Sequence, residues 1–361
     1  MSAPGWLQGA GVAPSAHNTQ PWQFSVLPDG RTAVRWAAER MLPVADPTSR
    51  DLYLSLGAAI ESACLRALAD GAPLHFEPAP PDADADRLAG WLIPAADAAE
   101  PDPVDLKLAA ALERRQTVRG PHLPSPVPPD VQADLIAEAA RHGRVLQIVT
   151  GRPTVGELAK LAGQATALLF ADAAVHAELW RWLRLDPADP AYQRDGLTAD
   201  CLELAGLPLL LARQLMPPAR MRWLSRTGLH HALAADIARI ARQSAAICLL
   251  SVPRDPMQTS YLDRAQLVDT GRVLQRLWLM AAAAGLTTHP LSALLDRPET
   301  AGRTQTLFAG AVSPAPAHWG GGWGEGAPLP FGAHVPAAVF RLGYASPAAR
   351  SPRLPLRELL T

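Results

Sequence analysis

Apolar residues recur at helical spacing in two long stretches of the chain, residues 52–68 and 268–284. A short strand-like run follows each of them, at 74–77 and at 287–291. The same kind of pattern predicts further helices and strands, the helices at 103–115, 129–142, 154–185 and 232–244 and the strands at 145–150, 246–252 and 337–342. Because the strands are fewer than the helices and dispersed among them, we predict an α+β fold with helices around a central sheet.

The two long apolar stretches also resemble each other. When Gly57 is aligned with Gly271, a second glycine follows fourteen residues later in both, at Gly71 and Gly285. Ile60 then aligns with Leu274, Glu61 with Gln275, Leu65 with Leu279 and His75 with His289. Any two apolar helices that end in glycine look alike, which is the alternative explanation. We favour two pseudo-symmetric halves, residues 1–105 and 106–361, with the proline-rich stretch 77–105 as a surface connection.

Composition narrows the functional classes. The 361 residues carry a net charge of −1, which gives no electrostatic reason to expect nucleic acid or an anionic membrane as a partner. Three cysteines, Cys64, Cys201 and Cys248, lie far apart without metal-ligand spacing, so we expect buried apolar side chains. The first residues have no basic region followed by an apolar core, and no apolar run reaches spanning length. A cytoplasmic protein is the expectation.

The strongest chemical signal lies near the N-terminus, at residues 13–24, which read APSAHNTQPWQF. Here a hydroxyl, an imidazole, two amides and a tryptophan lie close together around two prolines, just before a predicted strand. Amide groups offer both donors and acceptors, and prolines reduce the entropy lost when a loop is held in one conformation. Such a loop suits the edge of a heterocycle that is rich in carbonyl groups and ring nitrogens.

This loop resembles the flavin-contacting loop of the nitroreductase superfamily, and the chain as a whole resembles its fused, tandem Acg-type branch. Further matches are the DPTSR segment at 46–50, the LGAA segment at 56–59 and the tail from Arg341 to Pro355. The resemblance implies a nitroreductase-like fold and an FMN cofactor. Members are usually homodimers whose two sites each combine both subunits, with an arginine segment from one and the P-S-x-x-N loop from the other.

In this chain those two components are divided between the halves. The loop is in the first half, and the RQTVR segment at 115–119 opens the second half, which has no second loop of this kind. We therefore expect a fused pseudo-dimer with one FMN per chain, either monomeric or pairing again as a homodimer. The resemblance implies the cofactor-binding residues Pro14, Ser15, Ala16, Asn18, Gln20, Arg115, Gln116, Thr117, Arg119, Pro290, Leu291, Ser292 and Arg353.

Other polar or glycine-rich features of the sequence give less specific predictions of function. His17 lies within the loop, where contact with flavin or substrate and a structural role are both open. His230, His231 and His334 have no partner at metal-ligand spacing, so we expect no metal. The glycine-rich stretch 320–326 neither follows a predicted strand nor opens a helix, and we expect a flap near the pocket. The excursion 184–231 is either a lid over the flavin or a helix-packing insert.

These expectations lead to an FMN-dependent oxidoreductase of nitroreductase type. NAD(P)H would reduce the flavin, and a small organic acceptor would then be reduced in the same cleft by ping-pong transfer. The flavin carries the chemistry, so no residue is nominated as a nucleophile or general base. Two alternatives stay open: a protein that sequesters or senses FMN with little turnover, and a flavin dehydrogenase in a biosynthetic pathway.

Overall fold

The computed structural model describes residues 4–95, 100–228, 230–254, 262–311 and 333–361. Within them, eight of the ten described strands form two separate four-stranded antiparallel sheets. The first has the order β1-β2-β4-β3, with β1 Trp22–Val26, β2 Thr32–Trp36, β3 Leu74–Pro78 and β4 Leu88–Pro94. The second has the order β5-β8-β10-β9, with β5 Val145–Val149, β8 Ala246–Pro253, β9 Thr287–Pro290 and β10 His334–Gly343. The predicted α+β class is confirmed.

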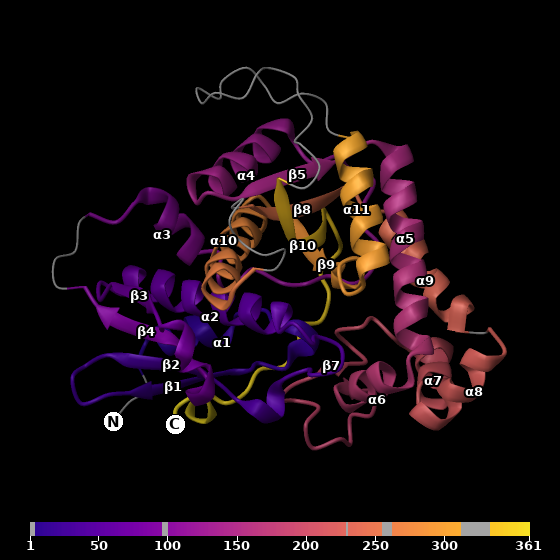
Figure 1. Ribbon diagram of the computed structural model, residues 1–361, viewed down its shortest axis with the longest axis horizontal. Coiled ribbons are helices and arrows are strands. Elements are labelled where there is room, and N and C mark those ends of the chain that lie inside the picture. The colour runs from indigo at the N-terminus through magenta and orange to yellow at the C-terminus, as the bar shows by residue number, and fades with distance from the viewer. Residues whose placement is uncertain (1–3, 96–99, 229, 255–261, 312–332) are drawn as a thin grey trace.

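Two long helices, α2 (Arg50–Ala69) and α10 (Arg264–Ala283), pack against each other near the centre of the molecule (Figure 1). Their crossing is nearly symmetric. A Cβ atom at Gly57 would lie 2.0 Å from the Val268 carbonyl oxygen, and one at Gly271 would lie 2.3 Å from the Leu54 carbonyl oxygen. Since 54 precedes 57 as 268 precedes 271, each glycine meets the equivalent position of the other helix. The pairing matches the alignment of the two stretches.

Buried charges join the elements around this helix crossing. The Arg276 guanidinium contacts Glu61 at 2.8 Å, Asp105 at 2.6 Å and Glu138 at 2.5 Å. These partners lie on α2, on α3 (Pro103–Ala109) and on α4 (Pro129–Arg141). Hydrogen bonds from the His142 ring and then from this guanidinium lower the pKa of the Glu138 carboxyl to about 2. A buried cation with several carboxylates fixes the relative register of four helices, because breaking such a cluster leaves an unpaired buried charge.

The remaining helices flank the second sheet, and the tail flanks the first. α5 (Arg152–Ala171), α9 (His230–Arg242) and α11 (Pro298–Ala311) lie to the right in Figure 1, above α6 (Ala173–Arg181), α7 (Gly206–Leu215) and α8 (Pro218–Arg226). The short α1 (Trp6–Gly11) packs on α2, and β6 (Leu183–Arg184) pairs in parallel with β7 (Leu197–Thr198). The C-terminal tail returns to the first sheet, where the Phe24 amide donates to the Leu359 carbonyl oxygen at 2.8 Å.

Two sequence-based predictions were wrong. The stretch 77–105 contains β4, an inner strand of the first sheet with Leu88, Ala89 and Leu92 buried, whereas we expected only a surface connection. The neighbouring prolines hid a seven-residue apolar run. The predicted single helix 154–185 is two helices at 95° to each other. Asp172 is extended at the break, and its carboxylate accepts the amides of Ala174 and Val175 as an N-cap.

Apolar burial accounts for the hydrophobic helix α2 and for the cysteines. Helix α2 is long and apolar enough to cross a membrane, and so is the bent pair α5–α6 if the two are counted as one span. However, 72% of the apolar stretch of α2 is buried inside the fold. The cysteines form no disulfide among the described residues. Cys201 and Cys248 are buried and Cys64 partly so, and burial raises the pKa of the Cys64 thiol to about 12. Their predicted role as apolar core residues is confirmed.

Candidate functional site

The loop between α1 and β1 has an unusual backbone. Its short 3-10 turn, Ala16–Asn18, is followed by Thr19 and Gln20, and three non-glycine residues have positive φ: His17 at 47°, Asn18 at 55° and Gln20 at 51°. Each such residue costs of the order of 1 kcal/mol, and such conformations persist only where the surroundings impose them. The Ser15 hydroxyl helps, since it accepts the Gln20 amide at 2.9 Å. Conformational strain is therefore concentrated in the segment that carries the motif.

The Asn18 side chain joins this loop to two distant segments. Its Nδ2 atom donates to the Gly196 carbonyl oxygen at 3.1 Å and to the Pro352 carbonyl oxygen at 2.9 Å. Its Oδ1 atom accepts a hydrogen bond from the Arg353 guanidinium. Both amide hydrogens are thus used within the protein. Asn18 places Arg353 beside the loop.

Gln20 has a comparable role but lies deeper. Its side chain is fully buried, donates to the Arg194 carbonyl oxygen at 2.9 Å and accepts the Leu354 amide at 2.8 Å. We expected Gln20 to approach a cofactor directly. In the structure it lies behind the cavity described below, where it holds the excursion and the C-terminal tail in place.

The arginine segment meets the loop from the other side. Arg115 follows α3 closely, and Thr117 forms a parallel bridge with Thr288 of β9. The Arg115 guanidinium donates to the Val12 carbonyl oxygen at 3.3 Å, and that of Arg353 donates to the same oxygen at 3.2 Å. Three segments that are far apart in the sequence therefore converge at one point, just before the loop begins.

A cavity of about 90 Å³ lies at this convergence. It contains side chains from the loop, from the arginine segment and from the tail. The lining residues are Val12, Pro14, Ser15, Asn18, Arg115, Gln116, Thr117, Arg119, Arg350, Ser351 and Arg353. Most of the residues that the sequence predicted for a cofactor site are brought together here.

The cavity is strongly cationic. Burial, followed by the charges of Arg353, Arg350 and Arg119, lowers the pKa of Arg115 to about 9. Burial and two of these neighbours lower the pKa of Arg353 to about 10. Within the described parts of the chain, none of the four guanidinium groups has a carboxylate within ion-pair distance.

Arg115 shows most clearly that positive charge in the cavity lacks partners. It is 5% exposed, and its buried Nε and Nη1 atoms have no hydrogen-bond partner. A buried charge without partners is costly, whereas an anion that accepts from it restores both the charge balance and the hydrogen bonds. The cavity thus has the donor set for an oxyanion with several acceptor oxygens, such as a phosphate monoester.

With Gln20, five of the predicted residues lie outside the lining of this cavity. The Ala16 amide faces Ser55, with its nitrogen 3.3 Å from the hydroxyl oxygen. Pro290 ends β9, and Leu291 is buried in the core, where its amide donates to the Val339 carbonyl oxygen at 2.8 Å. Ser292 begins the 3-10 turn Ser292–Leu294. This turn follows the strand that bridges to the arginine segment, but the structure does not bring it into the cavity lining.

His17 is buried next to the site and is not a cation at neutral pH. Burial lowers the pKa of its ring to about 4, and its Nδ1 atom has no partner. His230 and His231 stack on each other, with ring centroids 4.1 Å apart. No group of three or more metal-ligating side chains occurs in the described ranges.

The excursion 184–231 divides into two parts. Residues 194–203 pack against the site: the Cys201 carbonyl oxygen accepts from Arg119 at 3.2 Å, and the Glu203 carboxylate accepts the Gly120 amide at 2.8 Å. Helices α7 and α8 instead lie at the periphery, where α8 contacts α5, α6 and α9. The first part walls the site and the second is an insert packed on helices. The glycine-rich stretch 320–326, expected as a flap, lies outside the described residues.

Some residues at the site were not predicted. Val12, Arg350 and Ser351 line the cavity, although only Arg353 of the tail was singled out. Arg350 stands three positions before Arg353, so a cluster of cations in the tail was the signal that could have identified it. Glu203 and Gly196 had no signal, because nothing in the excursion indicates which of its residues reach the loop.

Comparisons with known proteins bear on this geometry. No family model matches the chain. A putative NAD(P)H nitroreductase of Mycobacterium tuberculosis is 37% identical over 139 residues, 38% of this chain and 39% of the relative. A probable NAD(P)H nitroreductase of Serratia, PigM, is 27% identical over 298 residues, 80% of this chain and 79% of the relative. The chain is thus similar to proteins named NAD(P)H nitroreductases, over about two fifths of its length in one case and about four fifths in the other.

The extent of these matches differs. The chain spans about two fifths of the length of the mycobacterial relatives and about four fifths of PigM. Among solved structures, the FMN-dependent nitroreductase NfnB of Mycobacterium smegmatis, in complex with NADPH, superposes with a TM-score of 0.37 at 18% identity, covering 70% of this chain and 97% of NfnB. NfrA2 of Bacillus megaterium gives a TM-score of 0.37 at 12% identity, covering 69% and 71%.

Proposed function

We propose that this chain binds FMN in the arginine-lined cavity and acts as an NAD(P)H-dependent oxidoreductase of nitroreductase type. The observation that carries the proposal is Arg115, a buried guanidinium with unpartnered nitrogens and three further arginines around it. FMN has a phosphate dianion, and a charge-assisted hydrogen bond to it contributes roughly 1.5–3 kcal/mol. The mycobacterial relatives, which are 37% identical to this chain over 139 residues, are likewise named putative NAD(P)H nitroreductases.

Each part of the site has a distinct task in this proposal. Arg115 and Arg353 would hold the phosphate, with Arg119 and Arg350 adding positive charge. Gln116 and Thr117 would reach the ribityl chain or the ring edge, and Pro14 with Ser15 would approach from the loop. The predicted contacts of Ala16, Gln20 and the turn 290–292 remain proposals that the cavity lining does not include.

Bound FMN supplies hydride and electron transfer, so the protein has to bind, orient and exclude water. The His17 ring, neutral at pH 7, has no charge to contribute to the ring pocket. Neither it nor any other side chain is proposed as a general base. We further propose that NAD(P)H and a small organic acceptor use the same cleft in turn. Steady-state rates at several NADPH concentrations should then give parallel double-reciprocal lines, and intersecting lines would contradict a shared cleft.

The chain is proposed to hold one such site because it is a fused pseudo-dimer. The halves 1–105 and 106–361 are supported by the symmetric crossing at Gly57 and Gly271. The loop and the arginine segment come from different halves and occur once each. Fusion would make assembly of the site intramolecular.

A storage or sensing role is the second candidate, and the wall formed by residues 194–203 favours it. Those residues hydrogen-bond to both the loop and the arginine segment, which would slow the exchange of bound flavin. Anaerobic mixing with NADPH separates the two roles. Rapid bleaching of the flavin absorbance supports the oxidoreductase, and an unchanged spectrum over many minutes supports storage.

The phosphate assignment has a specific test, since riboflavin is FMN without its phosphate. We expect the wild-type chain to bind FMN far more tightly than riboflavin in a fluorescence-quenching titration. In Arg115→Ala that preference should fall by roughly tenfold or more, because one charge-assisted contact is lost. Arg303→Ala, on the exposed face of α11, is the matched control and should keep the preference. Equal preference in Arg115→Ala and wild type would refute the assignment.

A further inference from the structure

Helix α7 exposes a row of leucines. None of its ten residues is buried, and Leu207, Leu210 and Leu211 are 65%, 55% and 46% exposed. The positions i, i+3 and i+4 lie on one face of a helix. Isolated exposed apolar side chains are common, but a row of them on one helix face indicates an interaction site for a protein or a membrane.

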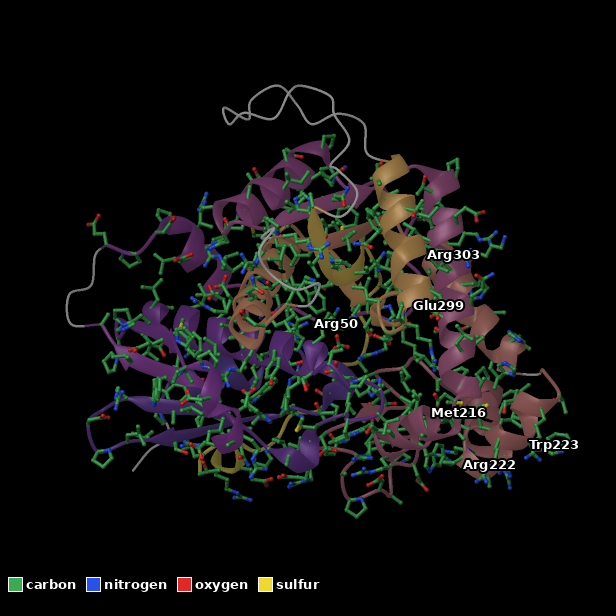
Figure 2. All side chains as sticks on the ribbon, in the orientation of Figure 1. Arg50, Met216, Arg222, Trp223, Glu299 and Arg303 are labelled. Carbon is green, nitrogen blue, oxygen red and sulfur yellow. The ribbon has the colours of Figure 1, made fainter. Side chains whose placement is uncertain are left out.

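Helix α8 adds a tryptophan between arginines. Trp223 is 63% exposed, while Met221 and Leu224 on the opposite face are buried and hold the helix in place. Arg222 and Arg226 are also exposed, and Figure 2 shows Arg222 and Trp223 projecting outward together at one end of the molecule. Their guanidinium groups have no hydrogen bond or ion pair within the described ranges. The exposed face of α8 is thus cationic and aromatic.

The two helices form one surface. They contact each other, and the Arg220 guanidinium donates to the backbone and side-chain oxygens of Gln214. Gln214 lies on the leucine face of α7, three residues after Leu211 and four after Leu210. Both helices lie at the end of the long axis opposite the two termini (Figure 1). Arg220 therefore connects the leucine row to the face that carries Trp223.

The charge of this region departs from that of the whole chain. Residues 204–235 contain four arginines and no aspartate or glutamate, while the chain as a whole has a net charge of −1. Arg213 is the only one of the four with an ion pair among the described residues, at 3.8 Å from Asp186. The average over the sequence, which gave no reason to expect a membrane partner, conceals a local cationic patch.

We propose that α7 and α8 form a docking surface for an anionic lipid membrane. Leucine and tryptophan side chains would enter the headgroup boundary, and the arginines would lie at the level of the lipid phosphates, as in interfacial amphipathic helices. A second copy of the chain fits less well, because a two-fold interface would place the arginine cluster of both copies in one contact, and residues 204–235 offer no carboxylate to balance it. The proposal concerns binding and is independent of the proposed function.

Sedimentation of the purified full-length chain with vesicles tests the proposal. We expect binding to vesicles of equal parts phosphatidylglycerol and phosphatidylcholine, little binding to phosphatidylcholine alone, and weakening when NaCl is raised from about 0.05 M to about 0.5 M. Each arginine near an anionic surface changes partitioning by roughly fivefold, so Arg222→Gln with Arg226→Gln should weaken binding by roughly 25-fold. Leu210→Ser with Leu211→Ser should also weaken it.

Controls give the experiment its specificity. Arg303→Gln, on α11 and above the α7–α8 surface in Figure 2, should bind as the wild type does, and so should Val26→Ser, an exposed apolar position on β1. Brominated lipids should quench the part of the tryptophan emission that Trp223→Phe removes. Absence of vesicle binding overturns the proposal, as does equal binding by the arginine variant. So does a concentration-dependent dimer that Leu210→Ser abolishes in a chain without vesicle affinity.

Discussion

Replacement of Arg115 by methionine should stabilise the cofactor-free protein, although it removes a buried, hydrogen-bonded side chain. In the cavity the pKa of Arg115 falls from its ordinary 12.5 to about 9. A shift of this size corresponds to roughly 5 kcal/mol against the charged form, mostly from burial and then from the neighbouring arginines. Relaxation of the cluster and the loss of the bond to Val12 reduce the gain, so we expect roughly 1–3 kcal/mol.

Chemical denaturation of the flavin-free variant and wild type measures this difference directly. The control is Arg276→Met, the same replacement at a buried arginine that has three carboxylate partners. That variant should lose roughly 3–5 kcal/mol, because Glu61, Asp105 and Glu138 lose their shared cation. The two substitutions should therefore change the unfolding free energy in opposite directions.

Adding FMN should reverse the order of wild type and Arg115→Met. A ligand at a hundred times its dissociation constant stabilises the folded state by about 2.7 kcal/mol, and the variant should lose most of that gain. The pH dependence has a defined sign as well. Because the folded-state pKa of Arg115 lies below its ordinary value, the cofactor-free wild type should gain stability as pH rises through about 9, and the variant should not. If Arg115→Met destabilises the flavin-free chain as Arg276→Met does, Arg115 is not an unpaired cation of an anion-binding site.

Three further predictions concern the supports of the site. Gly57→Ala would place a Cβ 2.0 Å from a carbonyl oxygen of α10 and should lower the free energy of unfolding in urea by roughly 2 kcal/mol or more. Gly156→Ala, whose added Cβ would have nothing within 4 Å, should instead raise it by about 1 kcal/mol. Equal effects of the two substitutions would contradict the close helix crossing. Glu138, with its pKa lowered to about 2, should contribute stability that is lost as pH falls from about 4.5 to about 2, and Glu138→Gln should flatten that part of the stability curve; an unchanged slope would remove Glu138 from the account. Gln20→Leu leaves the Arg194 carbonyl and the Leu354 amide unpaired and should lower the free energy of unfolding by roughly 2 kcal/mol. It should also make residues 184–204 susceptible to limited proteolysis. Protease resistance equal to that of the wild type would argue against the role of Gln20 in holding the excursion.

The sequence predicted local patterns well where hydrophobic periodicity and glycines agreed. The helices α2 and α10, their following strands and the pairing of Gly57 with Gly271 could all be inferred, because close helix packing requires glycine at matched positions. β4 was missed because proline-rich neighbours surround its short apolar run. The break at Asp172 was missed because helical periodicity continues across it, and only the capping carboxylate stops the first helix.

The sequence was sufficient to predict which segments come together at the site, but not which atoms contact each other there. The loop motif and the arginine segment contain most of the residues that line the cavity, and both stand out in the sequence because they resemble a flavin-contacting pattern. Which amide faces the ligand could not be read from the motif, and Gln20 lies behind the cavity. The excursion gave no signal for Gly196 or Glu203, because backbone carbonyl and amide partners leave no pattern in a sequence.

A titration of FMN into the flavin-free chain measures whether the N-terminal loop and the arginine segment together form one flavin site. Calorimetry with the chain concentration set by amino-acid analysis gives the stoichiometry. We expect one FMN bound per chain, with heat released that Arg115→Met largely removes. Two FMN per chain, or no binding by a folded wild-type protein, would contradict this expectation.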